Sequence, residues 1–301
     1  MRLHEESSIY SYDKVNKLVA LISGKPSANS ALVVMGGMTD GLMSLPAMPL
    51  LSEKCCSWNL ALVQFTMQSS TAGFGLHSLQ DDAEDFGKLL KSLKKRFLKV
   101  YLLGFSTGCQ DILWYLNQNT FIHNGEDDKK VIPHIVGIVL LNGVSDLDYI
   151  RNTCPDWRQL LTWANEKCDG DNGDEIYFKL IFGLPMNAYR IRSLLSEEGD
   201  DNMFSILLSQ DRLKEIFSPL KGVNLLVLFS ENDEYVPIKT VYQHLDAAYQ
   251  AVCGDSYKMT VLEGADHYVT PMTAQSNLLD LLDRFFVEIR SRTSNIQSET
   301  K

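Results

Sequence analysis

The stretch "KVYLLGFSTGCQD", residues 99–111, decides the fold. An apolar run that ends in Gly-x-Ser-x-Gly predicts a buried strand, a sharp turn at Ser106 and a helix directly after it. The backbone of such a turn is strained, so small residues are needed two positions before and after the serine, and Gly104 and Gly108 meet that need. We expect the Ser106 hydroxyl to stand at a helix N-terminus, where N–H groups favour a developing negative charge.

Short apolar runs alternate with helical patterns along the rest of the chain. This alternation predicts an α/β fold with a mostly parallel sheet and helices on both of its faces. Besides 99–105, strands are expected at 31–36, 59–65, 135–142, 224–230 and 258–264, with an antiparallel leading edge at 7–13 and 17–23. The clearest helix is expected over 78–97, where Ser78 and Asp81 form a capping box.

The segment 150–220 is long for a connection between two strands, and it is rich in aromatic residues. We expect it to form a largely helical cap insertion over the ends of the strands. The alternative is a pair of ordinary crossover helices with a disordered loop. If 150–220 is a cap insertion, residues 1–149 and 221–290 form the core, and the polar residues 291–301 are expected to form a disordered tail.

The composition narrows the class of protein. The chain has 301 residues, a net charge of −10 and 45% hydrophobic residues, which suits one large globular domain and leaves the oligomeric state open. No basic tract supports binding to nucleic acid or to an anionic membrane. The polar N-terminus and the lack of an apolar run of about 18 residues predict neither a signal peptide nor a membrane span. Six cysteines without CxxC spacing favour reduced thiols and a cytoplasmic location.

The predicted nucleophile needs a base. A serine hydroxyl is a weak nucleophile at neutral pH, so Ser106 requires a general base, and that base requires an acid to orient it. In proteins with this type of turn, the serine, the acid and the histidine follow successive strands in that order. Of the six histidines, only His267, in "VLEGADHYVT" (261–270), follows the last expected strand. We therefore predict that His267 is the base.

The acid is expected in the loop after the strand at 224–230. Asp233 lies three residues beyond that strand and just before Val236-Pro237, where the chain turns back toward a helix. Asp233 is therefore the predicted acid. Asp146, which follows the strand at 135–142, is the alternative, because some enzymes with this arrangement place the acid there.

A tetrahedral intermediate needs two N–H donors for its oxyanion. One is expected from Thr107, the residue after the serine. The other is expected from the loop "VMGGMTDGL" (34–42), where Gly36 and Gly37 let the backbone approach a substrate closely. Met38 is the predicted donor and Gly37 the alternative. No His, Cys or Asp cluster has metal-ligand spacing, so we expect neither a metal nor a cofactor.

Together these motifs resemble the α/β-hydrolase superfamily over nearly the whole chain. More narrowly, the sequence is similar to the DUF1749 (UPF0613) family, which includes fungal siderophore esterases. The similarity lies in "GGMTDGL" (36–42), "SSTAGFGLHSLQDDAED" (69–85), "GFSTGCQD" (104–111) and "GVSDLDY" (143–149). The sequence departs from many hydrolases in having Gly36 in place of a histidine, and Thr107 in place of Met, Gln or Leu. Neither departure removes a catalytic group.

The resemblance implies an α/β-hydrolase fold and a serine esterase with Ser106, Asp233 and His267 as its catalytic triad. Ser106 would attack the carbonyl of a small-molecule carboxylic ester, and water would then hydrolyse the acyl-enzyme. An acyltransferase or a thioesterase would use the same triad, and a hydrolase-fold receptor would bind a small molecule with little turnover. The cap is expected to select the substrate, while the loops of the sheet carry the chemistry.

Overall fold

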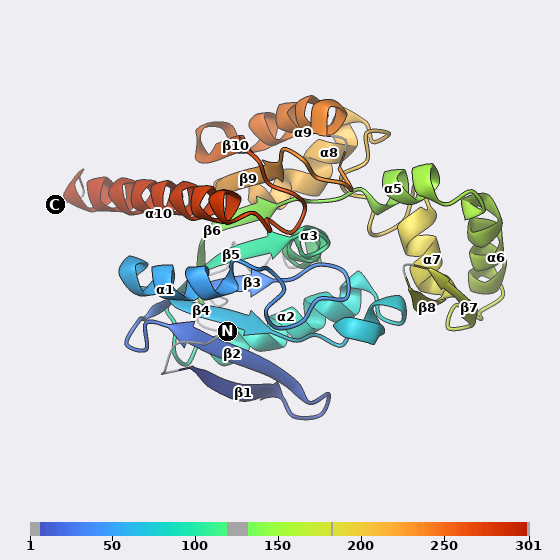
Figure 1. Cartoon of the computed structure of the whole chain (residues 1–301), viewed down its shortest axis with the longest axis horizontal. Coiled ribbons are helices and arrows are strands. Elements are labelled where there is room, and N and C mark those ends of the chain that lie inside the picture. Colours follow the sequence, from blue (N-terminus) through green and yellow to red (C-terminus); the bar gives the residue numbers. More distant parts are fainter. Residues whose placement is uncertain (1–6, 119–131, 182, 237, 300–301) are drawn as a thin grey trace.

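The computed structural model describes residues 7–118, 132–181, 183–236 and 238–299 of the chain. An eight-stranded sheet runs through it in the order β1-β2-β4-β3-β5-β6-β9-β10 (Figure 1). Strand β2 pairs antiparallel with both β1 and β4, and the other neighbouring strands are parallel. The mostly parallel sheet with an antiparallel leading edge is therefore confirmed.

The strands of this sheet lie where the sequence predicts them. They are β1 (Ser8–Asp13), β2 (Leu18–Gly24), β3 (Ser30–Met35), β4 (Ala61–Phe65), β5 (Lys99–Phe105), β6 (His134–Leu141), β9 (Asn224–Ser230) and β10 (Tyr257–Leu262). Alternate residues of β3 point to opposite faces, since Val33 belongs to one buried cluster and Leu32 and Val34 belong to another. Both faces are covered, which is why the central strands read as continuous apolar runs.

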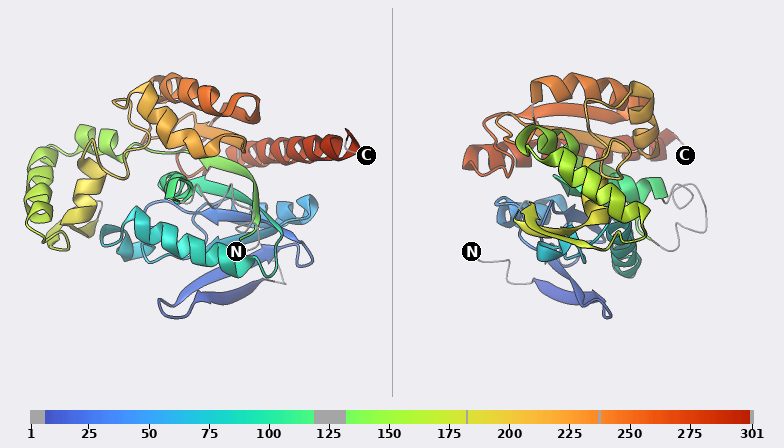
Figure 2. Two further views of the ribbon diagram at one scale, coloured as in Figure 1. Left: turned by 180° about the vertical axis from the view of Figure 1, so that it is seen from behind. Right: turned by 90° about the vertical axis from the view of Figure 1, so that its right-hand side faces the viewer.

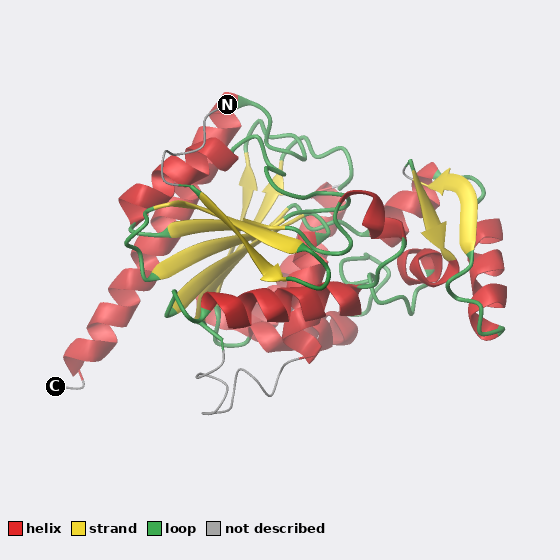
Figure 3. Cartoon of the chain, turned by 90° about the horizontal axis from the view of Figure 1, so that it is seen from below, coloured by secondary structure: helices red, strands yellow, loops and turns green. Residues whose placement is uncertain are grey.

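Helices cover both faces of the sheet, as Figure 3 shows from below. Helices α1 (Met48–Trp58) and α10 (Met272–Glu299) pack on one face. The other face carries α2 (Leu79–Leu93), α3 (Gly108–Gln118), α8 (Gln210–Phe217) and α9 (Ile238–Cys253). Residues 291–299 continue α10, where the sequence predicts a disordered tail. Extending a helix whose earlier turns are already packed costs less than starting one, so a polar composition does not prevent it.

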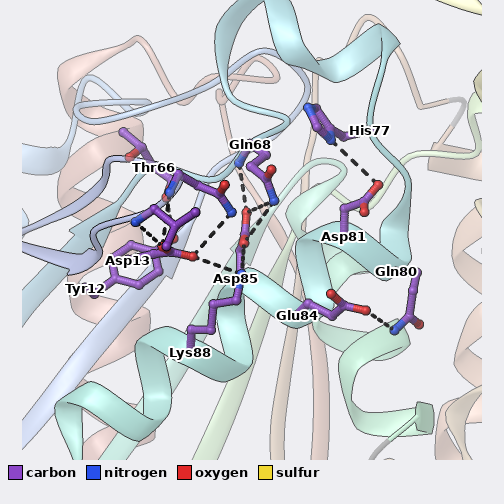
Figure 4. Close-up of polar contacts among 12 residues, drawn as sticks. Tyr12, Asp13, Thr66, Gln68, His77, Gln80, Asp81, Glu84, Asp85 and Lys88 are labelled. Carbon is purple, nitrogen blue, oxygen red and sulfur yellow. Dashed lines mark hydrogen bonds and ion pairs between the residues drawn. The ribbon is translucent and has the colours of Figure 1, made fainter.

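Helix α2 begins with the predicted capping box. The Ser78 hydroxyl accepts the Asp81 N–H at 3.2 Å, and the Asp81 carboxylate accepts the Ser78 N–H at 2.8 Å. Farther along the helix, the Lys88 ammonium bridges Asp85 at 3.1 Å and Asp13 of the edge strand at 2.9 Å (Figure 4). These contacts tie the antiparallel edge of the sheet to α2.

Residues 146–195 form a small lobe that follows β6 and projects from the sheet (Figures 1 and 2). The lobe contains α5 (Asp146–Thr153), α6 (Trp157–Asp169), β7 (Ile176–Ile181), β8 (Leu184–Asn187) and α7 (Ala188–Leu195). It has its own apolar cluster, in which Ile150, Leu160 and Ile191 are buried with Phe74 of the core. The small lobe thus has a separate interior and touches the core at Phe74.

Two features of this region differ from the sequence expectation. Strands β7 and β8 form an antiparallel pair within a segment expected to be largely helical. Helix α8 lies in the core layer, because Leu213, Ile216 and Phe217 are buried with residues of α3 and α9. The helices within 150–220 therefore divide between the small lobe and the core.

Candidate active site

Ser106 stands at a sharp turn between β5 and α3. Its φ is 56°, in the left-handed region that L-residues rarely adopt. A Cβ on Gly104 would lie 2.7 Å from the Gly108 carbonyl oxygen, and a Cβ on Gly108 would lie 2.5 Å from the carbonyl oxygens of Met35 and Gly36. Both glycines are therefore required by close backbone packing around the turn, which the sequence predicts.

The structure brings Ser106, His267 and Asp233 together. The Ser106 Oγ lies 3.0 Å from Nε2 of His267, and Nδ1 of the same ring lies 2.8 Å from Oδ2 of Asp233. A carboxylate can only accept, so Nδ1 carries the proton of the neutral ring and Nε2 accepts from the serine hydroxyl. Ser106 is 8% exposed and His267 3%, and the Asp233 side chain is fully buried. Water screens the charges of this chain of hydrogen bonds only weakly.

The second oxygen of the Asp233 carboxylate also accepts hydrogen bonds. Its Oδ1 accepts the backbone N–H groups of Tyr235 at 2.8 Å and of Val236 at 3.2 Å. A short Asp side chain that caps the N–H groups two and three residues ahead fixes a tight turn. The turn leaves Oδ2 directed at His267, so its geometry sets the orientation of the imidazole.

The His267 ring lies among aromatic side chains from the end of β5 and from two loops. Ring centroids lie 5.1 Å away for Phe105, 4.7 Å for Tyr235 and 5.4 Å for Tyr268. The backbone N–H of His267 donates to the Glu234 carboxylate at 3.1 Å. The imidazole is therefore packed on its sides and tied through its own main chain.

The loop after β3 places Gly37 directly against Ser106. A Cβ on Gly37 would lie 2.7 Å from the Ser106 Cβ. The Gly37 N–H already donates to Oδ2 of Asp40 at 2.8 Å. Burial raises the pKa of Asp40, against the lowering influence of that hydrogen bond and of His267. Within the described ranges, no acceptor is assigned to the N–H of Met38 or of Thr107.

Asp146, the alternative acid, lies elsewhere. It is the first residue of α5, and its carboxylate accepts from the Gln110 Nε2 at 2.7 Å. Burial raises its pKa to about 7, and the charge of Asp201 adds to the rise. Of the two candidate acids, the one hydrogen-bonded to His267 is Asp233.

Asp146 belongs to a second buried group, here named the Arg190 cluster. Its members are Asp82 of α2, Asp111 of α3, Asp146 of α5, Arg190 of α7 and Asp201. The Arg190 guanidinium lies 2.7 Å from the Asp201 carboxylate and over the Phe74 ring, 4.2 Å from its centroid. The cluster joins the small lobe to the core.

Three polar residues near the site have no role in the prediction from the sequence. Asn142 donates to the His267 carbonyl oxygen at 2.6 Å, Glu234 accepts the His267 N–H, and Asp40 accepts the Gly37 N–H. Asp40 and Glu234 lie within loops already singled out, so their position was a usable signal. Asn142 had none, because its partners Ser230 and His267 lie far away in the chain.

Two other kinds of site find no support in the described part of the chain. No group of three or more His, Cys, Asp or Glu side chains there is placed to hold a metal ion. None of the helices described combines the length and the apolar character needed to span a membrane.

The sequence matches the family described as "Protein of unknown function (DUF1749)" over residues 1–290. The chain belongs to the DUF1749 family. One relative is a UPF0613 protein of Schizosaccharomyces pombe, which is 26% identical over 316 residues, with 96% of each chain covered. Another is the fusarinine C esterase sidJ of Aspergillus fumigatus, 27% identical over 254 residues that cover 69% of this chain and 72% of the esterase.

Solved structures give this DUF1749 chain its fold class. The siderophore hydrolase EstB from Aspergillus fumigatus matches with a TM-score of 0.75 at 20% identity, covering 94% of this chain and 97% of EstB. An α/β-hydrolase-fold protein of unknown function matches with a TM-score of 0.67 at 18% identity, covering 98% and 99%. The α/β-hydrolase fold predicted from the sequence is confirmed.

Proposed function

We propose that this chain is a serine esterase in which Ser106 is the nucleophile, His267 the general base and Asp233 the orienting acid. The observation that carries the proposal is the continuous chain of hydrogen bonds from Ser106 Oγ through the imidazole to the Asp233 carboxylate, at 3.0 and 2.8 Å. Each bond has the polarity that a proton transfer from the hydroxyl to Nε2 requires.

In the first half of the reaction, Ser106 Oγ attacks the ester carbonyl carbon while Nε2 of His267 takes the hydroxyl proton. Asp233 stabilises the imidazolium that results. The tetrahedral intermediate collapses when the imidazolium returns the proton to the leaving alcohol, which leaves an acyl-Ser106 ester. In the second half, Nε2 of His267 takes a proton from a water molecule that attacks this ester; the bond from the acyl carbon to Oγ then breaks, the proton passes to Ser106 Oγ, and the acid leaves.

The oxyanion of the intermediate is proposed to bind the N–H groups of Thr107 and Met38. Thr107 directly precedes α3, so its N–H lies at the positive end of a helix. The Gly37 N–H is committed to Asp40, which favours Met38 over Gly37 as the second donor. Removing one such donor typically costs about 10²–10³ in kcat.

The substrate is proposed to be a small-molecule carboxylic ester. The esterases and hydrolases among the relatives support a hydrolase; one is named a fusarinine C esterase and another a siderophore hydrolase. The small lobe borders the site: the Tyr149 ring of α5 lies 5.1 Å from Tyr235, whose own ring lies 4.7 Å from His267. Met38 also packs against the apolar cluster of the small lobe. We therefore propose that the small lobe acts as the cap that selects the acyl or alcohol part.

A pre-steady-state assay with p-nitrophenyl acetate tests this proposal. A serine esterase that works through an acyl-enzyme releases a burst of p-nitrophenolate, close to one equivalent per chain, before steady turnover. Parallel reactions with added methanol or a thiol, analysed by mass spectrometry, show whether water or another acceptor takes the acyl group. Failure to release p-nitrophenolate from acetate, butyrate or octanoate esters would refute the esterase. A transfer product in excess of the free acid would reassign the chain as an acyltransferase.

A further inference from the structure

Asn142 is the first residue after β6, and it is fully buried at 0% exposure. Its φ is 53°, in the left-handed region that asparagine tolerates better than most residues. Its backbone N–H donates to the Leu228 carbonyl oxygen of β9 at 2.8 Å. The residue before it, Leu141, accepts the Ser106 N–H at 2.9 Å. The end of β6 is thus in direct contact with the backbone of the nucleophile.

The Asn142 side chain makes three further hydrogen bonds, all buried. Its Nδ2 donates to the Ser230 Oγ at 2.8 Å and to the His267 carbonyl oxygen at 2.6 Å. Its Oδ1 accepts the Ser230 N–H at 2.7 Å. Both amide hydrogens and the amide oxygen are therefore used, and the pattern fits no other side chain of this size.

These bonds connect three loops that are distant in sequence. Ser230 ends β9 and accepts, through its carbonyl oxygen, the Asp233 N–H at 3.4 Å. His267 lies in residues 263–271, a stretch between β10 and α10 without helix or strand. Such a loop has no ladder of its own to hold it, so contacts from outside determine where its side chains stand.

We propose that Asn142 is a positioning residue that holds His267 at bonding distance from Ser106. This role rests on the proposed function, because it assigns the imidazole as the base. Through Leu141 the end of β6 holds the main chain of Ser106, and through the Asn142 amide it holds the main chain of His267. One rigid strand end therefore sets the distance between the two groups that exchange a proton. A misplacement of about 1 Å in such a pair is enough to cost on the order of 10²-fold in rate.

Two substitutions separate this role from general stability. Asn142→Gly removes the amide and relieves the left-handed φ, while Asn142→Asp keeps the size and the φ preference but loses both donors. Asn224→Ala is the matched control. The Asn224 Nδ2 also links β9 to β6, by donating to the Val136 carbonyl oxygen at 3.0 Å, but it does so at the opposite end of both strands.

The test measures the pH profile of kcat and KM for p-nitrophenyl acetate and, without substrate, the low-field NMR resonance of the His267 Nδ1 proton. We expect each Asn142 variant to lower kcat by about 10- to 100-fold with little change in KM, because the base is displaced and not the pocket. We also expect the acidic limb of the profile to move and the Nδ1 resonance to shift or broaden. Asn224→Ala is expected to leave all of these unchanged.

Folded Asn142→Gly or Asn142→Asp protein with wild-type kcat, pH profile and resonance would overturn the inference. The inference would also be overturned if kcat fell only in proportion to the melting temperature and Asn224→Ala showed the same fall in both. If Asn142→Gly does not fold, Asn142→Asp supplies the same readings. Wild-type protein that hydrolyses no ester would refute the proposed function instead, and the Nδ1 resonance would still report on the position of His267.

Discussion

Two buried groups of polar side chains lie near the boundary between the core and the small lobe, and they are built differently. In the chain of Ser106, His267 and Asp233, each carboxylate oxygen and each ring nitrogen has a partner. In the Arg190 cluster, four carboxyl groups surround one guanidinium. Within the described residues, partners are lacking for Oδ1 of Asp82, Oδ1 of Asp201 and Nε of Arg190.

The two buried groups differ in how far their negative charges are balanced by donors and positive charges. Burial raises the pKa of Asp82 and of Asp146 to about 7, and it raises the pKa of Asp111, where the neighbouring Asp82 adds to the effect. Arg190 opposes these rises but is shared among all four carboxyl groups. A buried carboxylate with its own donors is suited to orient a base, whereas crowded carboxyl groups retain protons instead. We therefore propose that the first group carries the chemistry and that the second makes the stability of the fold depend on pH.

The largest expected effect comes from removing the serine of the first group, with a serine that contacts the Arg190 cluster as the control. Ser106→Ala should lower kcat for p-nitrophenyl esters by on the order of 10⁶, because no nucleophile remains. Ser193→Ala is the matched control: Ser193 is also buried, and its hydroxyl donates to Asp201 at 2.6 Å. Ser193→Ala should lower the free energy of unfolding while leaving kcat within a few-fold of the wild-type value. Equal activity of the two variants would remove the distinction between the groups.

The next effect separates the two candidate acids. Asp233→Asn should lower kcat by about 10⁴, because the amide favours the wrong tautomer of His267. Asp146→Asn should leave kcat nearly unchanged, since the Asn oxygen can still accept from Gln110 and the carboxylate hydrogen-bonded to His267 belongs to Asp233. The measurement is kcat of the purified Asp233→Asn and Asp146→Asn variants at one pH. The opposite ranking would move the acid to Asp146.

A smaller effect concerns the border between the small lobe and the site. Tyr149→Ala should change the ratio of kcat/KM between a short and a long ester, by up to the 10- to 200-fold that one apolar pocket contact provides (roughly 1–3 kcal/mol). Hydrolysis of the acetate ester should change less than about tenfold. Tyr189→Ala is the control, because Tyr189 of α7 is exposed and donates to Asp200. Parallel changes in both variants would show that Tyr149 acts on the fold and not on the pocket.

The smallest effect is on stability. The raised pKa of Asp146 means that the folded state binds this proton more tightly than the unfolded chain, whose pKa is near 4. The resulting stabilisation is full below about pH 4 and is lost as the pH rises to about 7. Asp146→Asn should therefore raise the free energy of unfolding at pH 8, by on the order of 1 kcal/mol, with little change at pH 4.

Urea unfolding of wild type and Asp146→Asn at pH 4 and at pH 8 tests the direction of this change in the free energy of unfolding. The exposed Asp211 supplies the control Asp211→Asn, which should shift little at either pH because its side chain is 96% exposed. A variant that is less stable than wild type at pH 8 would show that the Asp146 charge is satisfied in the folded state.

Local patterns were enough to predict the sheet, the turn at Ser106 and the loops that carry Asp233 and His267. Alternating strands and helices predict a mostly parallel sheet, and the loops at the carboxyl ends of parallel strands lie at one edge of that sheet. The antiparallel pair β7–β8 and the core position of α8 depend on packing between distant segments, which periodicity does not encode. Asn142 and Arg190 were missed for the same reason. A buried asparagine or arginine is recognisable only once its partners are known.

Labelling with a fluorophosphonate probe, followed by peptide mapping, tests the central claim most directly. Such a probe bonds covalently to a serine that an adjacent base has activated, and it leaves ordinary serines unmodified. We expect one adduct per chain, on the peptide that contains Ser106, with esterase activity lost in proportion to labelling. An adduct on another residue, or full activity in protein whose Ser106 is modified, would contradict it.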